Sequence, residues 1–191
     1  MAVEQRRSIQ LTDPRAMRAL AHPTRLRLLG ELRVRGPQSV GMLCDLIDEA
    51  PGSVSYHLGT LAAYAFVEEA PELARDRRER WWRAAHARTT WEPLEALEDP
   101  ERRAASDSLR RAIFRRYLDR LEGYLEGEPS LDPEWVRGTA SSDTFLHLTS
   151  QELVELRDEL EALAARWEGR SDPSRPGAHG VTLIYHAFRG P

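Results

Sequence analysis

The segment PGSVSYHLGTLAAY, residues 51–64, contains the clearest periodic pattern in the chain. Its apolar residues recur at the spacing of one helical face, and the pattern runs on to residue 65: Val54, Leu58, Leu61, Ala62 and Ala65. This spacing predicts an amphipathic helix that packs through a single stripe. Proline suits its first turn, because that turn leaves amide hydrogens unbonded anyway. The opposite face presents Gly52, Ser53, Tyr56, Gly59, Thr60 and Ala63, with Ser55 and His57 on its flanks.

Further helices are predicted upstream of this segment. Asp13-Pro14 has the form of an N-cap followed by a proline at the first helical position. Pro23 falls inside the apolar span that follows, which leaves two alternatives: a kinked helix, or a short helix followed by another that starts near Thr24. Gly36-Pro37 ends this span, and Ser39 is predicted to cap the next short helix.

A basic hairpin is predicted downstream. Phe66–Ala70 and Arg80–Ala85 are short strand candidates, and the charged stretch Glu72–Glu79 lies between them. Two strands joined in this way form a β-hairpin. Its tip is rich in arginine, with side chains at Arg75, Arg77, Arg78 and Arg80.

The second half of the chain is predicted to be helical with two further strands. The expected elements are a linker over 92–100, a helix over 101–126, a loop over 129–142, a strand over 143–148, a helix that follows it, a flexible stretch over 169–180 and a buried strand over 181–188. The last helix opens on a capping box, Thr149-Ser150-Gln151-Glu152. Its leucines follow a 3-4-3-4 spacing, which is typical of helix-on-helix packing either between two chains or within one.

Length and composition set the domain organisation. The chain has 191 residues, of which 41% are hydrophobic and 30% charged, as in a soluble globular protein. We expect an arm over 1–12, a winged helix-turn-helix domain over 13–90 and a dimerisation or effector region over 91–191. The fold class is mainly α with a small β component, and the second region is helical or α+β.

Charge and targeting signals also limit the function. All 27 basic residues are arginine, and the net charge of -4 divides into +3 for residues 1–90 and -7 for residues 91–191. Only the first half therefore suits a polyanionic partner. The chain has no apolar run of about 20 residues and no secretory signal, so we expect a cytoplasmic protein with no membrane partner.

Two motifs resemble those of ArsR-like winged-helix repressors. Leu20-Ala21-His22-Pro23-Thr24-Arg25-Leu26-Arg27-Leu28-Leu29 is similar to the opening of that family, and Ser55–Leu61 followed by Phe66-Val67-Glu68 is similar to its recognition helix and the entry to its wing. The resemblance covers about residues 13–90 and implies a homodimeric transcription regulator. Ala65-Phe66 stands where the family usually has Gly-Leu, so the turn before the wing is expected to differ.

Duplex DNA is the partner that this arrangement favours. A helix in the major groove needs short polar side chains outside and an apolar stripe behind, and basic wing residues suit phosphates or the minor groove. The candidate DNA contacts are Ser39, Ser53, Ser55, Tyr56, His57, Thr60, Arg75, Arg77, Arg78 and Arg80. A homodimer would place its two recognition helices about 34–36 Å apart on a palindromic operator.

Other functions have weaker support in the sequence. Cys44 is the only cysteine, and the six histidines show no helical pairing, so no metal or cofactor site is expected. No nucleophile elbow, phosphate-binding glycine loop or catalytic carboxylate pair stands out, which argues against an enzyme. Two alternatives stay open: a sensor with a small-molecule effector pocket in the second half, and a winged helix that binds protein.

Overall fold

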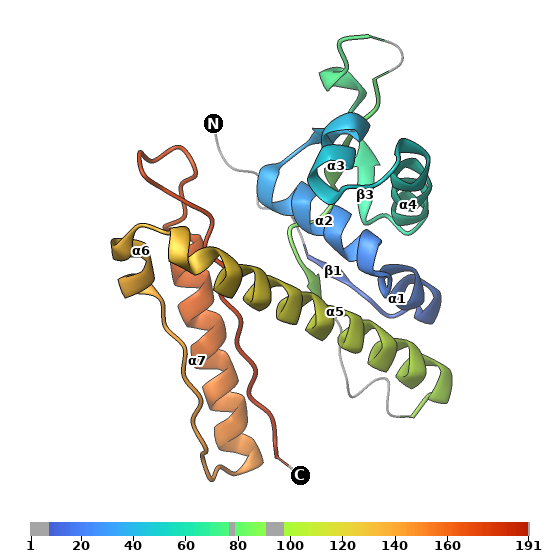
Figure 1. Ribbon diagram of the computed structural model, residues 1–191. Helices are drawn as coiled ribbons and strands as arrows, with labels where there is room; N and C mark the ends of the chain where they lie inside the picture. Colours follow the sequence, from blue (N-terminus) through green and yellow to red (C-terminus); the bar gives the residue numbers. More distant parts are fainter. Residues whose placement is uncertain (1–7, 77–78, 91–97, 191) are drawn as a thin grey trace. The chain divides into compact units, whose positions relative to one another are not determined.

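The computed structural model describes residues 8–76, 79–90 and 98–190. The chain is mainly helical with small sheets, and it divides into two compact units, Met1–Leu125 and Glu126–Pro191. Figure 1 shows α1 to α5 with the short strands in the first unit. Among the described residues, no helix has the length and hydropathy needed to cross a bilayer.

The first unit begins with a short strand and a short helix. Strand β1 (Ile9–Gln10) pairs in parallel with β5 (Thr89–Thr90), and Leu11 is buried. Part of the predicted arm therefore packs against the domain, which differs from the sequence prediction, because Ile9 and Leu11 have apolar surface to bury. Helix α1 (Pro14–Leu20) has the predicted cap: the Asp13 carboxylate accepts a hydrogen bond from the Arg15 amide.

The alternative at Pro23 is resolved as two separate helices. Helix α1 ends before Ala21, and α2 (Pro23–Arg35) begins with the proline at its first position. The chain then turns at Gly36, whose φ of 78° lies in the left-handed region that glycine adopts without strain. Arg33 in α2 donates to the His86 carbonyl, which joins this helix to the end of the wing.

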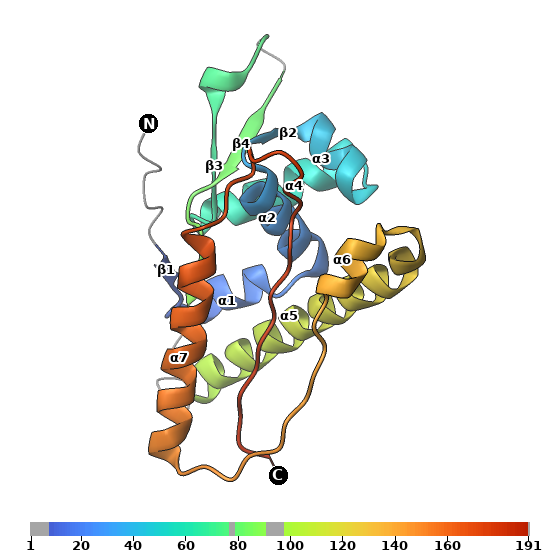
Figure 2. The same cartoon turned by 90° about the vertical axis from the view of Figure 1, so that its left-hand side faces the viewer.

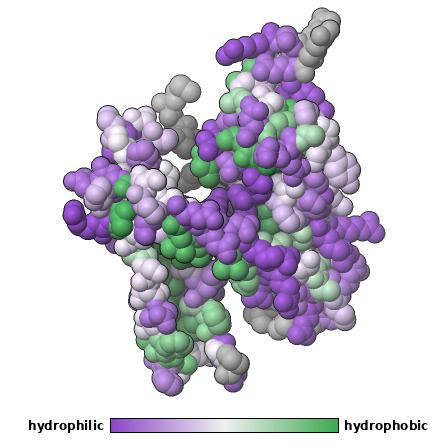
Figure 3. All heavy atoms as spheres, in the orientation of Figure 1, coloured by the Kyte–Doolittle hydropathy of each residue, from purple (hydrophilic) through white to green (hydrophobic). Residues whose placement is uncertain are grey.

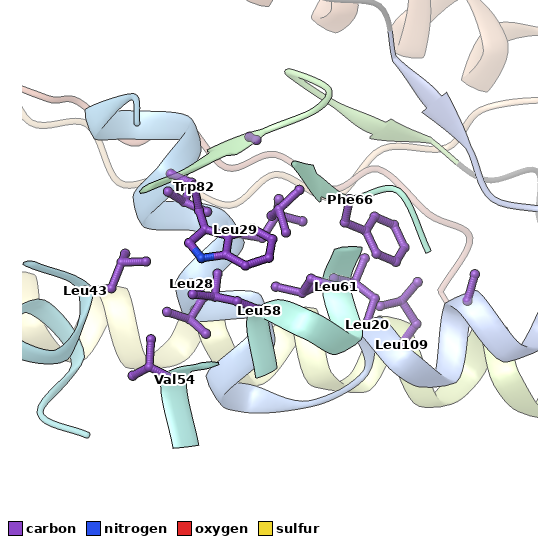
Figure 4. Close-up of a cluster of buried hydrophobic side chains, with 14 of the residues drawn as sticks. Leu20, Leu28, Leu29, Leu43, Val54, Leu58, Leu61, Phe66, Trp82 and Leu109 are labelled. Carbon is purple, nitrogen blue, oxygen red and sulfur yellow. The ribbon is translucent and has the colours of Figure 1, made fainter. Parts of the chain in front are cut away.

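Helices α3 (Val40–Ile47) and α4 (Pro51–Ala63) complete the helical layer. Ser39 caps α3 as predicted, since its hydroxyl accepts from the Met42 amide. Figure 4 shows how the buried side chains of α2, α3 and α4 meet around Trp82 and Phe66. The fully buried members of this core include Leu28, Leu32, Leu43, Val54, Leu58, Leu61 and Phe66.

The wing is a three-stranded antiparallel sheet, which contains the two strands of the predicted hairpin and a third strand that the sequence analysis does not predict. Its order is β2 (Gln38–Ser39), β4 (Trp81–Ala84) and β3 (Val67–Glu69), with β4 in the middle. A single 3-10 turn, η1 (Pro71–Leu73), follows β3. Figure 2 shows β3 and β4 rising side by side away from the helices. The wing therefore projects from the helical layer.

The turn from α4 into the wing contains an alanine in an unusual conformation. The Phe66 amide donates to the Leu61 carbonyl at 3.0 Å, and the Ala65 amide donates to the Ala62 carbonyl at 2.9 Å. This is the hydrogen-bond pattern of a helix that ends on a left-handed residue, where glycine is usual. Ala65 has a φ of 57°. Alanine thus occupies a left-handed position that usually falls to glycine.

Helix α5 (Pro100–Gly127) matches the predicted long helix. Its first half belongs to the core of the first unit, because Ala105 and Leu109 are buried among the residues of α1, α2 and α4. Arg18 of α1 forms an ion pair with Glu101 at the start of α5. Farther along, α5 presents large exposed side chains on one face: Phe114, Leu118, Leu121 and Leu125.

The second unit contains helices and extended chain. A 3-10 turn, η3 (Glu128–Ser130), is followed by α6 (Pro133–Gly138), which lies where a loop is predicted, and α7 (Ser150–Glu168) has the predicted capping box at Thr149. No residue between 126 and 190 is buried. Figure 3 shows hydrophobic surface on this unit. Its large exposed residues include Phe145, Leu146, Trp167, Val181, Leu183 and Phe188.

The two strands predicted in this unit, 143–148 and 181–188, are wrong for the single chain. Both segments run outside helices and strands, and their apolar side chains are mostly exposed. A strand is stabilised by a ladder to a neighbouring strand and by an apolar surface below it. The described chain gives these segments neither, although residues 143–148 alternate as in a strand and residues 181–188 are apolar on both faces, as in a buried strand.

Candidate nucleic-acid interface

Helix α4 has the two faces that its sequence predicts. Val54, Leu58 and Leu61 have no exposed surface and point into the core (Figure 4). Tyr56 lies on the opposite side, with 68% of its surface exposed. Gly52, Gly59 and Ala63 share this exposed side. The helix is therefore anchored by leucine and valine and presents a tyrosine among residues with little or no side chain.

A carboxylate outside the helix holds its N-terminal turn. Glu49 accepts a hydrogen bond from the Ser53 hydroxyl at 2.5 Å and another from the Thr24 hydroxyl at 2.7 Å. These two bonds hold the pKa of Glu49 below its ordinary value. Because Thr24 lies in α2, the carboxylate joins the starts of α2 and α4. Ser53, a predicted DNA contact, thus uses its hydroxyl inside the domain.

His57 lies in a stack of rings next to this junction. It is buried, and its ring centroid lies 4.6 Å from that of His22 and 5.2 Å from that of Tyr56, which it meets edge-on. Burial lowers the pKa of His57, and the nearby His22 and Arg25 lower it further. The neutral ring therefore supports Tyr56 from behind. A DNA contact by His57 itself stays a prediction.

Three more of the predicted contacts lie on or beside α4. Ser55 is partly exposed, and Thr60 donates its hydroxyl to the Tyr56 carbonyl at 3.0 Å. Ser39 is buried at the start of α3, where it serves as the helix cap. Tyr56 is the most exposed of the predicted contacts on α4. DNA contacts by all of these residues, Tyr56 included, stay predictions.

Two of the described arginines of the wing, Arg80 and Arg83, are held by acidic neighbours. Arg80 pairs with Glu69 across the hairpin, and its guanidinium lies 5.1 Å from the ring centroid of Trp82. Arg83 contacts Glu68 at 2.7 Å and Glu72 at 2.6 Å. Arg75 is exposed at the far end of the wing.

Arg77 and Arg78, which are also predicted contacts, lie outside the described residues. From Phe66 to Ala85 the sequence has five arginines and five acidic residues, so the formal charge of the wing is zero.

Two residues of this surface are missing from the sequence prediction. Glu49 precedes Ser53 by four residues, but Pro51 separates it from the helix, so helical spacing does not reveal the bond between them. Arg25 of α2 lies close enough to Tyr56 and Tyr64 to be affected electrostatically by both. The signal for Arg25 is its place in the Leu20–Leu29 motif, which does not show what it contacts.

No metal centre is visible in the part of the chain that the structure describes, where no three His, Cys, Asp or Glu side chains cluster. Cys44 is partly buried in α3, and burial raises the pKa of its thiol. A thiol with a raised pKa is a poor metal ligand and a poor nucleophile at neutral pH.

Comparison with known families identifies the core of this site. Residues 20–70 match a family model described as a helix-turn-helix domain. The chain contains a helix-turn-helix domain. The matched region spans α2, β2, α3, α4 and β3, so the exposed helix and two of the three wing strands belong to it. No curated protein matches the chain significantly.

Among solved structures, a transcriptional regulator from Thermotoga maritima is similar at a TM-score of 0.32 and 15% identity, over 82% of this chain and 87% of that one.

Proposed function

We propose that this protein is a sequence-specific, DNA-binding transcription regulator of the ArsR-like winged-helix type. The observation that carries the proposal is the exposed Tyr56 face of α4, held by a buried stripe inside a helix-turn-helix domain and flanked by an arginine-bearing wing. A helix with this support can enter the major groove while the wing reaches the adjacent backbone. In this proposal α4 reads base edges.

The wing supplies phosphate contacts by exchanging partners. Arg75 and Arg80 are described at its surface, and Arg77 and Arg78 join them from the sequence. Arg80 leaves Glu69 when a phosphate replaces the carboxylate, so DNA binding costs the wing an ion pair. Exposed ion pairs contribute about 0–1 kcal/mol, which a phosphate contact can offset.

The rest of the chain acts as dimerisation material in this proposal. Residues 13–90 bind DNA, and residues 91–191 join two copies, so that the operator is a palindrome with half-sites about one helical turn apart. The exposed side chains of α5 and of the second unit support this assignment, because apolar surface of this extent favours a protein partner. A DNA-binding role of this kind implies a cytoplasmic protein.

The test is selection of bound duplexes from a random pool by the full-length protein, followed by gel shifts over a range of salt concentrations. We expect one palindromic sequence to be enriched. Arg75→Ala combined with Arg80→Ala should weaken binding to every duplex and make the salt slope shallower by about two. Arg110→Ala combined with Arg111→Ala, at two exposed residues of α5, is the matched control for the two lost charges.

Each of the two alternative functions has its own test. Selection without any enriched sequence would contradict it and favour the protein-binding winged helix. Thermal shifts with small molecules test the effector alternative, which stays a prediction.

A further inference from the structure

The chemistry of α4 limits which bases it can read. Between Pro51 and Ala63 the helix has no arginine, lysine, aspartate, glutamate, asparagine or glutamine. In the major groove, arginine or lysine reads guanine through two hydrogen bonds, asparagine or glutamine reads adenine in the same way, and a carboxylate accepts from cytosine. None of these readers is present on α4.

The hydroxyl groups of the helix are also largely engaged. Ser53 donates to Glu49, and Thr60 donates to the backbone of its own helix. Ser55 is partly buried, whereas Tyr56 is mostly exposed. The exposed chemistry of α4 is therefore dominated by one aromatic ring with a hydroxyl at its tip.

The ring of Tyr56 has support from inside the domain. The His57 ring meets it edge-on, and His22 lies against His57 on the other side. An aromatic side chain held in this way contributes apolar contact surface with little loss of entropy on binding. In the major groove, the apolar feature of a base pair is the C5 methyl group of thymine.

The glycines beside Tyr56 leave room for close approach. A Cβ atom added at Gly52 or Gly59 would meet no heavy atom within 4 Å, and neither residue has a positive φ. Glycine in a helix is less stable than alanine by about 0.5–1 kcal/mol. No contact in the domain requires glycine at these two positions, and the exposed backbone leaves room for a base edge beside Tyr56.

We infer that α4 reads thymine methyl groups through the ring of Tyr56, so that each half-site is recognised by its A·T pairs rather than by hydrogen bonds to guanine. This rests on the proposed function, since it assumes that α4 enters the major groove. Tyr56 is the specificity-determining residue, and His57 and His22 are positioning residues that hold its ring.

The test uses the duplex enriched by the full-length protein, with single bases replaced. Uracil in place of thymine removes only the C5 methyl group, and 7-deazaguanine removes the N7 acceptor of guanine. We expect uracil at one or two positions of each half-site to weaken binding about four-fold per methyl group, the usual effect of losing one buried methyl contact. 7-Deazaguanine should leave the affinity unchanged.

Two variants assign the effect to the ring. Tyr56→Ala should bind thymine and uracil duplexes equally, and Tyr56→Phe should keep the preference for thymine, because the ring and not the hydroxyl makes the contact. Full affinity for uracil duplexes, or loss of affinity for 7-deazaguanine duplexes, would overturn the inference. Either result would leave the proposed DNA-binding function standing, because the unmodified duplex is still bound. Failure to enrich any duplex would instead overturn the proposed function.

Discussion

Gly59 offers a substitution that should raise stability and lower DNA affinity together. It lies on the exposed side of α4, its φ is not positive, and the space around an added Cβ is open. Gly59→Ala should therefore gain the full helix preference of alanine, about 0.5–1 kcal/mol. For a protein of this size that corresponds to a rise in Tm of about 1–4 °C.

The same methyl group should interfere with DNA. If the backbone of α4 lies against base edges, an added Cβ overfills a packed interface, which costs about 1–3 kcal/mol. The affinity for the selected duplex should then fall by about five-fold or more. Urea unfolding followed by circular dichroism measures the first effect, and gel shifts on the same preparation measure the second.

Ala65 provides the matched control, because the opposite substitution should also stabilise the same helix. Its φ of 57° is a conformation that costs a non-glycine residue about 1–2 kcal/mol, so Ala65→Gly should gain about 0.5–1 kcal/mol after glycine's larger unfolded-state entropy is subtracted. It lies in the turn after α4, so DNA affinity should not change. If Gly59→Ala destabilises the protein, or binds the duplex as well as Ala65→Gly does, the reasoning about the exposed glycines is refuted.

Three further predictions follow from ion pairing, packing and protonation. Glu69→Gln removes the carboxylate that holds Arg80. Gel shifts should therefore show DNA binding about 1.4- to five-fold tighter, which corresponds to the 0.2–1 kcal/mol of an exposed ion pair. Leu109→Ala leaves a cavity where α5 packs against the other helices of the first unit and should cost about 2–5 kcal/mol in urea unfolding. Burial lowers the pKa of His57 below its ordinary value of 6.5, so the unfolded chain binds a proton at this histidine at a higher pH than the folded chain does. The Tm should therefore fall as the pH drops below about 6.5, and His57→Gln should make that fall smaller.

Each of these has a control. Asp107→Asn on the exposed face of α5 makes the same charge change as Glu69→Gln and should leave the DNA affinity nearly unchanged, so equal gains would point to net charge alone. Ser108→Ala, also exposed on α5, should change stability by less than about 0.5 kcal/mol. The pKa of Glu49 is lowered as well. The stability that this carboxylate contributes is lost only below about pH 4.5, so its titration does not overlap with that of His57.

The elements that sequence predicts well are those with local signals. The stripe through Val54, Leu58 and Leu61 predicts α4 correctly, because the face that helical spacing makes apolar is the face that the structure buries. Asp13, Ser39 and Thr149 each mark a helix start with a side chain that the structure shows bonded to the predicted turn. Such signals lie within a few residues of the feature they specify.

The site is harder to predict because its chemistry depends on contacts between distant segments. His57 looks like a flanking residue of α4, yet it is buried against His22, thirty-five positions earlier in the chain. Ser53 looks free, yet Glu49 holds it together with Thr24. Tertiary contacts thus engage Ser53 and His57 within the domain, whereas Tyr56 faces outward.

The charge distribution determines how strongly a single copy of the chain can be attracted to DNA. The wing has a formal charge of zero, α4 has no charged side chain, and residues 1–125 hold 21 arginines against 19 acidic residues. Non-specific attraction to DNA scales with the phosphates neutralised, so a single copy should hold random duplex only weakly. Two linked copies gain affinity without added charge, because binding of the first half-site raises the effective concentration of the second recognition helix. An uncharged helix α4 therefore favours the proposed dimer, whose binding would depend on both half-sites. We expect the exposed apolar surface of the second unit to form the interface of that dimer.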